Sequence, residues 1–123
     1  MIPFSRADRV SALIQEVLSD LLRKKIRDPR LAMTTITRVR MSPDLKLARI
    51  YFSIYGGSKK SEAAALGFES ARGFIKRSLA PRLGLRYMPD LQFFYDDSFD
   101  YSSHIEQLLK KIADDDGPDS QSD

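Results

Sequence analysis

Residues 33–55 read MTTITRVRMSPDLKLARIYFSIY, and this stretch decides the fold. Residues 33–41 alternate in parity and are rich in β-branched side chains, which is typical of a β-strand. Ser42-Pro43-Asp44 favours a turn. Residues 45–55 form a second alternating segment, with Ile50, Phe52 and Ile54 on its core face. The stretch therefore predicts an antiparallel β-hairpin.

Neither strand of this hairpin keeps its apolar residues on a single parity. The first strand has Ile36, Arg38 and Arg40 on one parity and Thr35, Thr37, Val39 and Met41 on the other. In the second strand, Leu45 and Leu47 have the opposite parity to Ile50. Because successive side chains point to opposite faces of a strand, we predict a register slip near Ala48, through a β-bulge.

An amphipathic helix is predicted before the hairpin. Ser5 and Asp8 have the spacing of a capping box, in which each side chain bonds the backbone N–H of the other residue. Apolar residues then repeat at helical spacing at Val10, Leu13, Ile14, Val17, Leu18, Leu21 and Leu22. Asp28-Pro29 is expected to stop this helix.

Two more helices are predicted after the hairpin. The first begins at Ser61 and has an alanine-rich face. Gly73 interrupts the pattern, which resumes from Phe74 to Leu83, so we expect two helices joined tightly at Gly73. Pro81 is expected to bend or end the second of these helices.

Residues 91–95 alternate again and predict a third strand, and Ser103 opens a capping box for a short helix that runs to Ile112. The predicted order is helix, strand, strand, helix, helix, strand and short C-terminal helix. This order favours an α+β fold with a three-stranded sheet and its helices on one face. We expect residues 1–113 to form one domain and residues 114–123 to be a disordered acidic tail.

The charge of the chain is uneven along its length. The 20 Lys and Arg residues exceed the 17 Asp and Glu residues by only three, but five of the acids lie in the last ten residues. Residues 1–113 therefore carry an excess of eight positive charges, which favours binding to a polyanion such as RNA. The chain has no cysteine, no secretory pattern and no apolar run of about 18 residues, so a cytoplasmic protein is expected.

Catalytic equipment is sparse in this sequence. His104 is the only histidine, and no cysteine, phosphate-binding Gly-rich loop or zinc-ligand spacing is present. We expect a protein that is not an enzyme and uses no cofactor or metal. The alternative is a Mg²⁺-dependent nuclease that uses Asp96, Asp97 and Asp100, since clustered carboxylates can hold Mg²⁺ for phosphoryl chemistry. Turn and cap formation explains these aspartates more simply.

Basic side chains suggest where RNA would bind. The main group surrounds the expected helix joint and consists of Arg72, Gly73, Lys76, Arg77, Arg82 and Arg86. Gly73 would let an RNA backbone approach closely, and free amide groups at a helix start could accept a phosphate. Arg38, Arg40 and Lys46 form a second group around the hairpin, and a third on the first helix has a structural explanation as helix-end cations. Tyr51, Tyr55 and Tyr87 could stack on bases, although packing explains each of them as well.

From Arg6 to Ile112 the chain resembles the ribosome-binding factor A family, bacterial factors for assembly of the small ribosomal subunit. The resemblance lies in RADRV at 6–10, RDPR at 27–30, SPDL at 42–45, ARIY at 48–51, ARGFI at 71–75 and PDLQFFYDDS at 89–98. Pro81 departs from the family, whose third helix has ordinary helix formers at this point.

The resemblance implies a type II KH-like fold, in which an Ala-x-Gly kink, here Ala71-Arg72-Gly73, joins two helices. It also implies binding to free small (30S) subunits and 16S rRNA, with a role in late assembly and in maturation of the rRNA 5′ end. Such factors are often noted in cold adaptation. We expect a monomer whose partner is the small ribosomal subunit, with neither a membrane nor a small-molecule substrate.

Overall fold

The computed structural model describes residues 5–98 and 108–112. Its elements are α1 (Arg6–Lys24), the short 3-10 helix η1 (Pro29–Leu31), β1 (Thr34–Met41), β2 (Leu47–Ile54), the 3-10 helix η2 (Gly57–Lys60), α2 (Ser61–Leu83) and β3 (Asp90–Tyr95). Residues 108–112 are also helical, as predicted. The predicted capping box at Ser103 and the tail at 114–123 lie outside the described residues.

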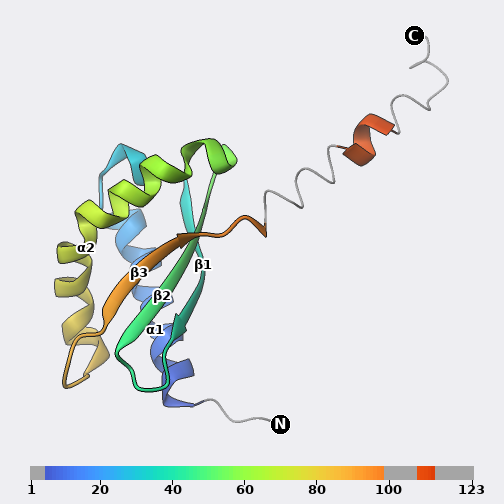
Figure 1. The fold of residues 1–123 in the computed structure, drawn as a ribbon. Helices are drawn as coiled ribbons and strands as arrows, with labels where there is room; N and C mark the ends of the chain where they lie inside the picture. The colour runs from blue at the N-terminus through green and yellow to red at the C-terminus, as the bar shows by residue number, and fades with distance from the viewer. Residues whose placement is uncertain (1–4, 99–107, 113–123) are drawn as a thin grey trace, which may run out of the picture.

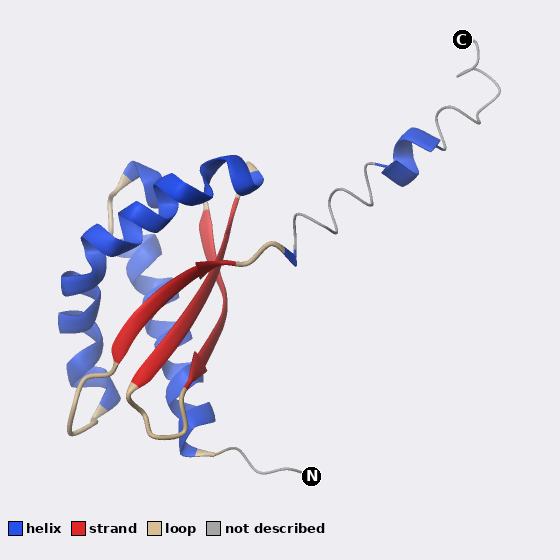
Figure 2. Ribbon diagram, viewed as in Figure 1, coloured by secondary structure: helices blue, strands red, loops and turns tan. Residues whose placement is uncertain are grey.

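The three strands form one mixed sheet in the order β1-β2-β3 (Figure 2). β1 and β2 pair antiparallel, which confirms the predicted hairpin. β3 pairs parallel to β2, because α2 carries the chain back across the sheet between them. α1 and α2 both lie on one side of the sheet, with α1 behind the strands and α2 to their left in Figure 1, and neither covers the other side. The α+β class with helices on one face is confirmed.

The capping box of α1 is confirmed. The Ser5 hydroxyl accepts from the Asp8 N–H at 3.1 Å, and the Asp8 carboxylate accepts from the Ser5 N–H at 3.1 Å. α1 ends at Lys24, before Asp28, whose carboxylate instead accepts from the Arg30 N–H and begins η1. The helix therefore starts at the predicted residue and ends one turn earlier than Asp28-Pro29 alone indicated.

The predicted position of the β-bulge is wrong. The register shifts in β1, between Ile36 and Arg38, whereas Ala48 pairs regularly with Met41 and is fully buried. Leu45 lies in the turn with a φ of 62°, and Leu47 begins β2 half-buried on the face opposite Ile50, so neither leucine requires a slip in β2. The bulge at Thr37 brings Val39 and Met41 to the buried face beside Ile36, and it turns Arg38 and Arg40 outward.

The prediction of two helices joined at Gly73 is also wrong. α2 is one continuous α-helix of 23 residues that runs through both Gly73 and Pro81. Its ribbon changes direction near the middle, so the helix is bent without being interrupted (Figure 1). Pro81 does not end it, because the helix continues to Leu83 and closes at Gly84, which takes the left-handed conformation with φ 64°.

Side chains cover both edges of the sheet. On the β1 edge, the Ser11 hydroxyl accepts from the Met41 N–H at 2.9 Å, and the Gln15 amide donates to the Ile36 carbonyl at 3.2 Å. On the β3 edge, the Arg72 guanidinium donates to the Leu91 carbonyl. These bonds occupy backbone groups that would otherwise be open to pairing with another strand.

One apolar core lies between the sheet and the two long helices. Phe68 of α2 packs its ring on Phe52 and Phe93, with centroids 4.8 Å apart in each case. Gly67 allows η1 to approach α2, since a Cβ there would lie 3.0 Å from the Leu31 side chain. Within residues 5–98 and 108–112, no helix is both long and apolar enough to span a membrane.

Candidate RNA-binding surfaces

Arg72 and Lys76 lie on the side of α2 that faces β3, and both bond to neighbouring groups. The Arg72 guanidinium is paired with the Glu69 carboxylate at 2.6 Å, donates to the Leu91 carbonyl and lies 5.6 Å from the Phe93 ring. The Lys76 ammonium is 3.3 Å from the Asp90 carboxylate. Each side chain is only 31% exposed. Arg72 and Lys76, both predicted to contact RNA, therefore bond α2 to β3 in the free protein.

Gly73 does not provide the free amides that the sequence suggested. An interior residue of an α-helix donates its N–H to the carbonyl four residues earlier, and α2 continues through Gly73. Gly73 is exposed, and the Arg77 side chain reaches back beside it, 3.2 Å from where a Cβ would stand. Close approach of an RNA backbone at Gly73 stays a prediction, but phosphate capture by a helix start there does not fit this geometry.

The other basic residues of the α2 group are exposed. Arg77 and Arg82 lie on α2 itself, and Arg86 follows the helix, with its guanidinium 5.5 Å from the Tyr87 ring. None of the three forms an ion pair among the residues that the structure describes. They are the members of this group best placed to meet phosphate.

The hairpin group divides between the sheet and its turn. Arg38 and Arg40 project from β1 on the face that the helices leave open, and Lys46 is exposed in the turn. The Arg38 guanidinium lies 4.3 Å from the centre of the Tyr51 ring. The Tyr51 ring in turn stacks on Phe94, with centroids 5.5 Å apart.

Sequence reasoning missed two residues of this open face, Arg49 and Phe94. Arg49 pairs directly with Arg40 across the hairpin, and Phe94 is 39% exposed beside Tyr51. The hairpin register would have revealed Arg49, because it has the outward parity in β2. The same parity argument would have revealed Phe94, because it shares the outward parity of Gln92 in β3, opposite Leu91 and Phe93.

The carboxylate of Asp96 fastens the end of β3 to the bulge in β1. It accepts from the Thr37 hydroxyl at 2.7 Å and from the Ser98 hydroxyl and N–H at 2.6 and 3.0 Å. The hydrogen bonds from Ser98, and then those from Thr37, hold the pKa of Asp96 below its usual value. Asp97 is exposed, Asp100 lies outside the described residues, and the described part of the chain contains no cluster of three metal-binding side chains.

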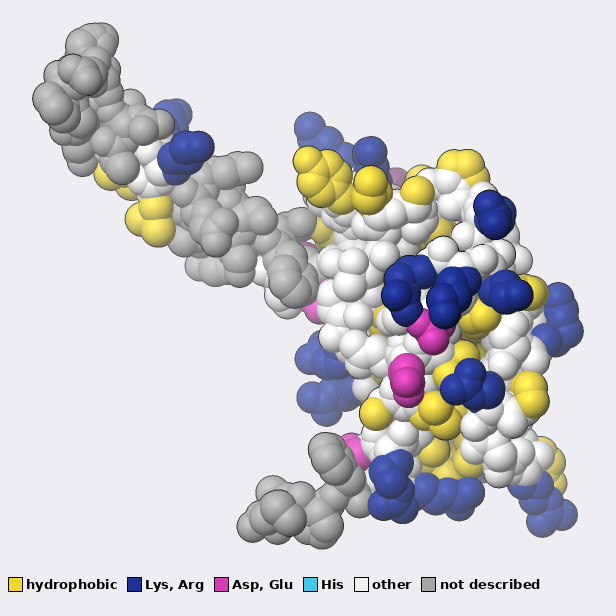
Figure 3. Space-filling model, turned by 180° about the vertical axis from the view of Figure 1, so that it is seen from behind, with side chains coloured by type: hydrophobic (Ala, Val, Ile, Leu, Met, Phe, Trp, Pro, Cys, Tyr) yellow, Lys and Arg dark blue, Asp and Glu magenta, His cyan; other side chains and the backbone are white. Residues whose placement is uncertain are grey.

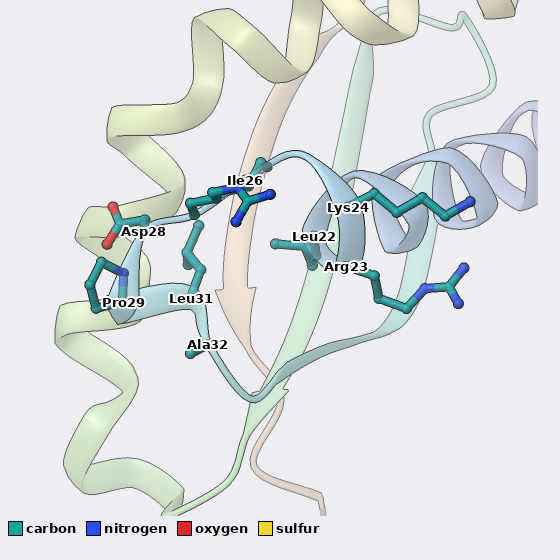
Figure 4. Close-up of a pocket in the computed structure, with 9 residues that line it drawn as sticks. Leu22, Arg23, Lys24, Ile26, Asp28, Pro29, Leu31 and Ala32 are labelled. Atoms are coloured by element: carbon teal, nitrogen blue, oxygen red, sulfur yellow. The ribbon is translucent and has the colours of Figure 1, made fainter.

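The helical face carries a further basic group at the end of α1, together with acidic side chains (Figure 3). Arg23, Lys24, Lys25 and Arg27 are exposed there. A hollow of about 370 Å³ lies beside them, and Leu22, Ile26 and Leu31 line it (Figure 4). Asp28 at its rim is paired with Arg30 at 2.6 Å, which lowers the pKa of its carboxyl group.

Comparison with known proteins identifies relatives over nearly the whole chain. Residues 6–109 match the family described as ribosome-binding factor A. The ribosome-binding factor A of Desulfatibacillum aliphaticivorans is 51% identical over 114 residues, which cover 93% of each chain.

Solved structures of similar proteins have the same fold. The crystal structure of ribosome-binding factor A from Thermus thermophilus is 25% identical, with a TM-score of 0.65, and covers 72% of this chain and 93% of that one. A homology model of the Thermus thermophilus factor, fitted into the cryo-EM map of a 30S–RbfA complex, is 25% identical with a TM-score of 0.59. That match covers 71% of this chain and 91% of the other. By family match, sequence identity and fold together, this chain belongs to the ribosome-binding factor A family.

Proposed function

We propose that this chain binds free small (30S) ribosomal subunits through 16S rRNA and assists late subunit assembly and maturation of the rRNA 5′ end. The observation that carries the proposal is the family match over residues 6–109, since another member of that family has been fitted into a 30S complex. The excess of eight positive charges in residues 1–113 supports it, because rRNA presents a dense array of phosphates.

The exposed arginines of α2, with Arg86 just after it, are our candidates for the subunit contact. Arg77, Arg82 and Arg86 lack a described acidic partner, whereas Arg72 and Lys76 are paired with Glu69 and Asp90. A side-chain cation without an acidic partner binds a phosphate by releasing only solvent ions, whereas a paired cation must first break its ion pair with the carboxylate. Arg72 and Lys76 thus support the surface, and the three exposed arginines meet the RNA.

The proposed role requires no chemical step, cofactor or metal, and it requires only one copy of the chain. We place the protein in the cytoplasm, where such a factor would meet its subunit, and we expect its role to matter most during adaptation to cold.

The nuclease alternative is weakened by Asp96, whose carboxylate oxygens accept hydrogen bonds from Thr37 and Ser98. A protein-only adaptor would bind in a way that survives high salt and RNA digestion.

Co-sedimentation with purified small subunits, large subunits and whole ribosomes tests this function, at about 0.15 M salt to screen weak surface attraction. We expect the protein to pellet with free small subunits and not with the other two particles. Equal pelleting with all three, or with none, would contradict the proposal. Precursor rRNA incubated with the protein and Mg²⁺ should stay intact, and shortening of it would support the nuclease instead.

A matched pair of variants locates the contact. Arg77→Gln with Arg82→Gln removes two charges from α2, and Lys59→Gln with Lys60→Gln removes two exposed charges from η2. We expect the first variant to lower the affinity for small subunits roughly tenfold at 0.15 M salt and the second to change it little. If both weaken binding equally, α2 has no special part and only total charge matters.

A further inference from the structure

The open face of the sheet carries a set of side chains that the α2 surface does not explain. Neither α1 nor α2 covers this face, which is turned toward the viewer in Figure 1. Its outward residues include three arginines and two aromatic rings, contributed by all three strands: Arg38, Arg40, Arg49, Tyr51 and Phe94. The same parity also carries Thr35, Ser53 and Gln92, and it carries Leu47 and Asp90 where β2 and β3 begin. Asp90 is paired with Lys76 of α2, and Asp96 lies near Arg38 at the other end of β3.

Two of the arginines are placed against each other. Arg40 and Arg49 are direct cross-strand partners in the β1–β2 register, and both are exposed. Like charges directly opposite each other on a sheet destabilise it. No carboxylate pairs with either arginine in the described part of the chain. The pair therefore costs stability in the free protein, and an anion bound between the two guanidinium groups would offset that cost.

The aromatic rings lie next to this pair. Arg38 covers one side of the Tyr51 ring at 4.3 Å, and Phe94 stacks on Tyr51 with the ring planes 29° apart. Tyr51 and Phe94 are direct partners in the parallel register of β2 and β3. Phe94 stays 39% exposed even so, and this leaves an apolar ring facing solvent within a basic surface. Aromatic rings beside cations are the arrangement with which proteins hold unpaired bases.

We propose that this open sheet face binds single-stranded RNA, with Arg40 and Arg49 on phosphates and the Tyr51–Phe94 pair stacked against bases. The inference rests on the proposed function for its choice of RNA. A duplex does not suit the rings, because its bases are already stacked on one another and present only their edges. The occupant is therefore a single-stranded segment of rRNA, bound on a face separate from the arginines of α2.

The test uses the full chain and a labelled single-stranded oligouridylate of about ten nucleotides, with fluorescence anisotropy over a range of salt concentrations. Arg40→Gln with Arg49→Gln should reduce the slope of log affinity against log salt by roughly 1.4, as expected for two lost phosphate contacts on a single strand. Tyr51→Val with Phe94→Val keeps strand-forming residues. It should raise the Kd roughly tenfold while leaving the salt slope unchanged.

Two controls and a duplex complete the test. Lys59→Gln with Lys60→Gln removes the same charge away from the sheet, and Phe74→Leu removes an aromatic ring that is 38% exposed on α2, nearly the same exposure as Phe94. Both should bind the oligonucleotide like the unmodified protein, and circular dichroism verifies the fold of every variant. A blunt RNA duplex should bind more weakly than the single strand. Equal losses in the controls, or equal affinity for duplex and single strand, would overturn the proposal.

Failure of this inference can be told apart from failure of the proposed function. If the protein pellets with small subunits but the sheet-face variants bind the oligonucleotide normally, the sheet-face site is rejected and the subunit role stands. If the variants lose the oligonucleotide but the unmodified protein does not pellet with small subunits, the sheet face binds RNA and the proposed ribosomal role is rejected.

Discussion

The cations of α2 next to β3 and the cations of the open sheet face are the same residue types in opposite settings. Arg72 and Lys76 have carboxylate partners in Glu69 and Asp90, and Arg72 also bonds a strand carbonyl. Arg40 and Arg49 face each other, and neither is paired with an acid among residues 5–98 and 108–112. A basic residue beside an acid and a buried edge serves the fold, whereas basic residues crowded together without an acid reduce stability and point to an anionic partner.

The largest effect that would sharpen this comparison is on stability. Arg72→Met should lower the free energy of unfolding by about 1–3 kcal/mol, because the Leu91 carbonyl at the β3 edge loses its donor. Urea unfolding followed by circular dichroism measures it, with Arg77→Met as the control on the exposed side of the same helix. A loss below about 0.5 kcal/mol in both variants would mean that Arg72 does not hold α2 to β3.

An intermediate effect concerns Asp96, the carboxylate that lies near Arg38 on the rim of the open face. Asp96→Asn should lower the free energy of unfolding at pH 7 by about 1 kcal/mol, since the hydrogen bonds from Thr37 and Ser98 lose a charged acceptor. It should also tighten binding of single-stranded RNA slightly, since it removes a negative charge beside the arginines.

The pH dependence of stability checks the same variant. The pKa of Asp96 is lowered by folding, so its contribution is present above the unfolded value near 4 and is lost as pH falls through the folded value. Stability should therefore fall less steeply below about pH 4 in Asp96→Asn. Asp44→Asn is the control, because the pKa of Asp44 is also lowered, chiefly by Ser42, in a turn far along the chain from Asp96. In Asp44→Asn, stability should likewise fall less steeply below about pH 4, but the affinity for RNA should not change.

The smallest expected effect is the change in stability when Arg40 is replaced, and a loss of stability there would contradict the comparison. Arg40→Thr should leave stability unchanged or raise it by a few tenths of a kcal/mol, because it relieves the repulsion with Arg49 and keeps a strand-forming residue. Thermal and urea unfolding at low salt measure it, since salt screens the repulsion. A clear loss of stability would show that Arg40 has a structural partner, and the open face would then resemble the α2 side.

Two sequence predictions were wrong, the position of the β-bulge and the helix break at Gly73, because in each case the local pattern is compatible with two structures. Leu45 was counted in β2, so the slip was expected near Ala48, but it belongs to the turn and the bulge lies at Thr37. The bulge is placed at Thr37 by two contacts between strands: Arg38 pairs with Tyr51, and the Thr37 hydroxyl donates to Asp96. The local pattern predicts a helix break at Gly73, but a glycine costs a helix only about 1 kcal/mol, which the burial of Phe68 and Ile75 can outweigh.

The sequence by itself determined the hairpin, the capping box of α1, the helix-and-sheet class and the basic character of residues 1–113. These depend on residue type, spacing and near neighbours along the chain. Only the tertiary structure decided which cations bond to β3, because Asp90 reaches Lys76 and the Leu91 carbonyl reaches Arg72 only once α2 packs along β3. The pairing of Arg72 with Glu69, by contrast, lies within α2 and follows from their i, i+3 spacing. It also decided that Arg49 and Phe94 join Arg38, Arg40 and Tyr51, since strands distant in sequence meet only in the sheet register.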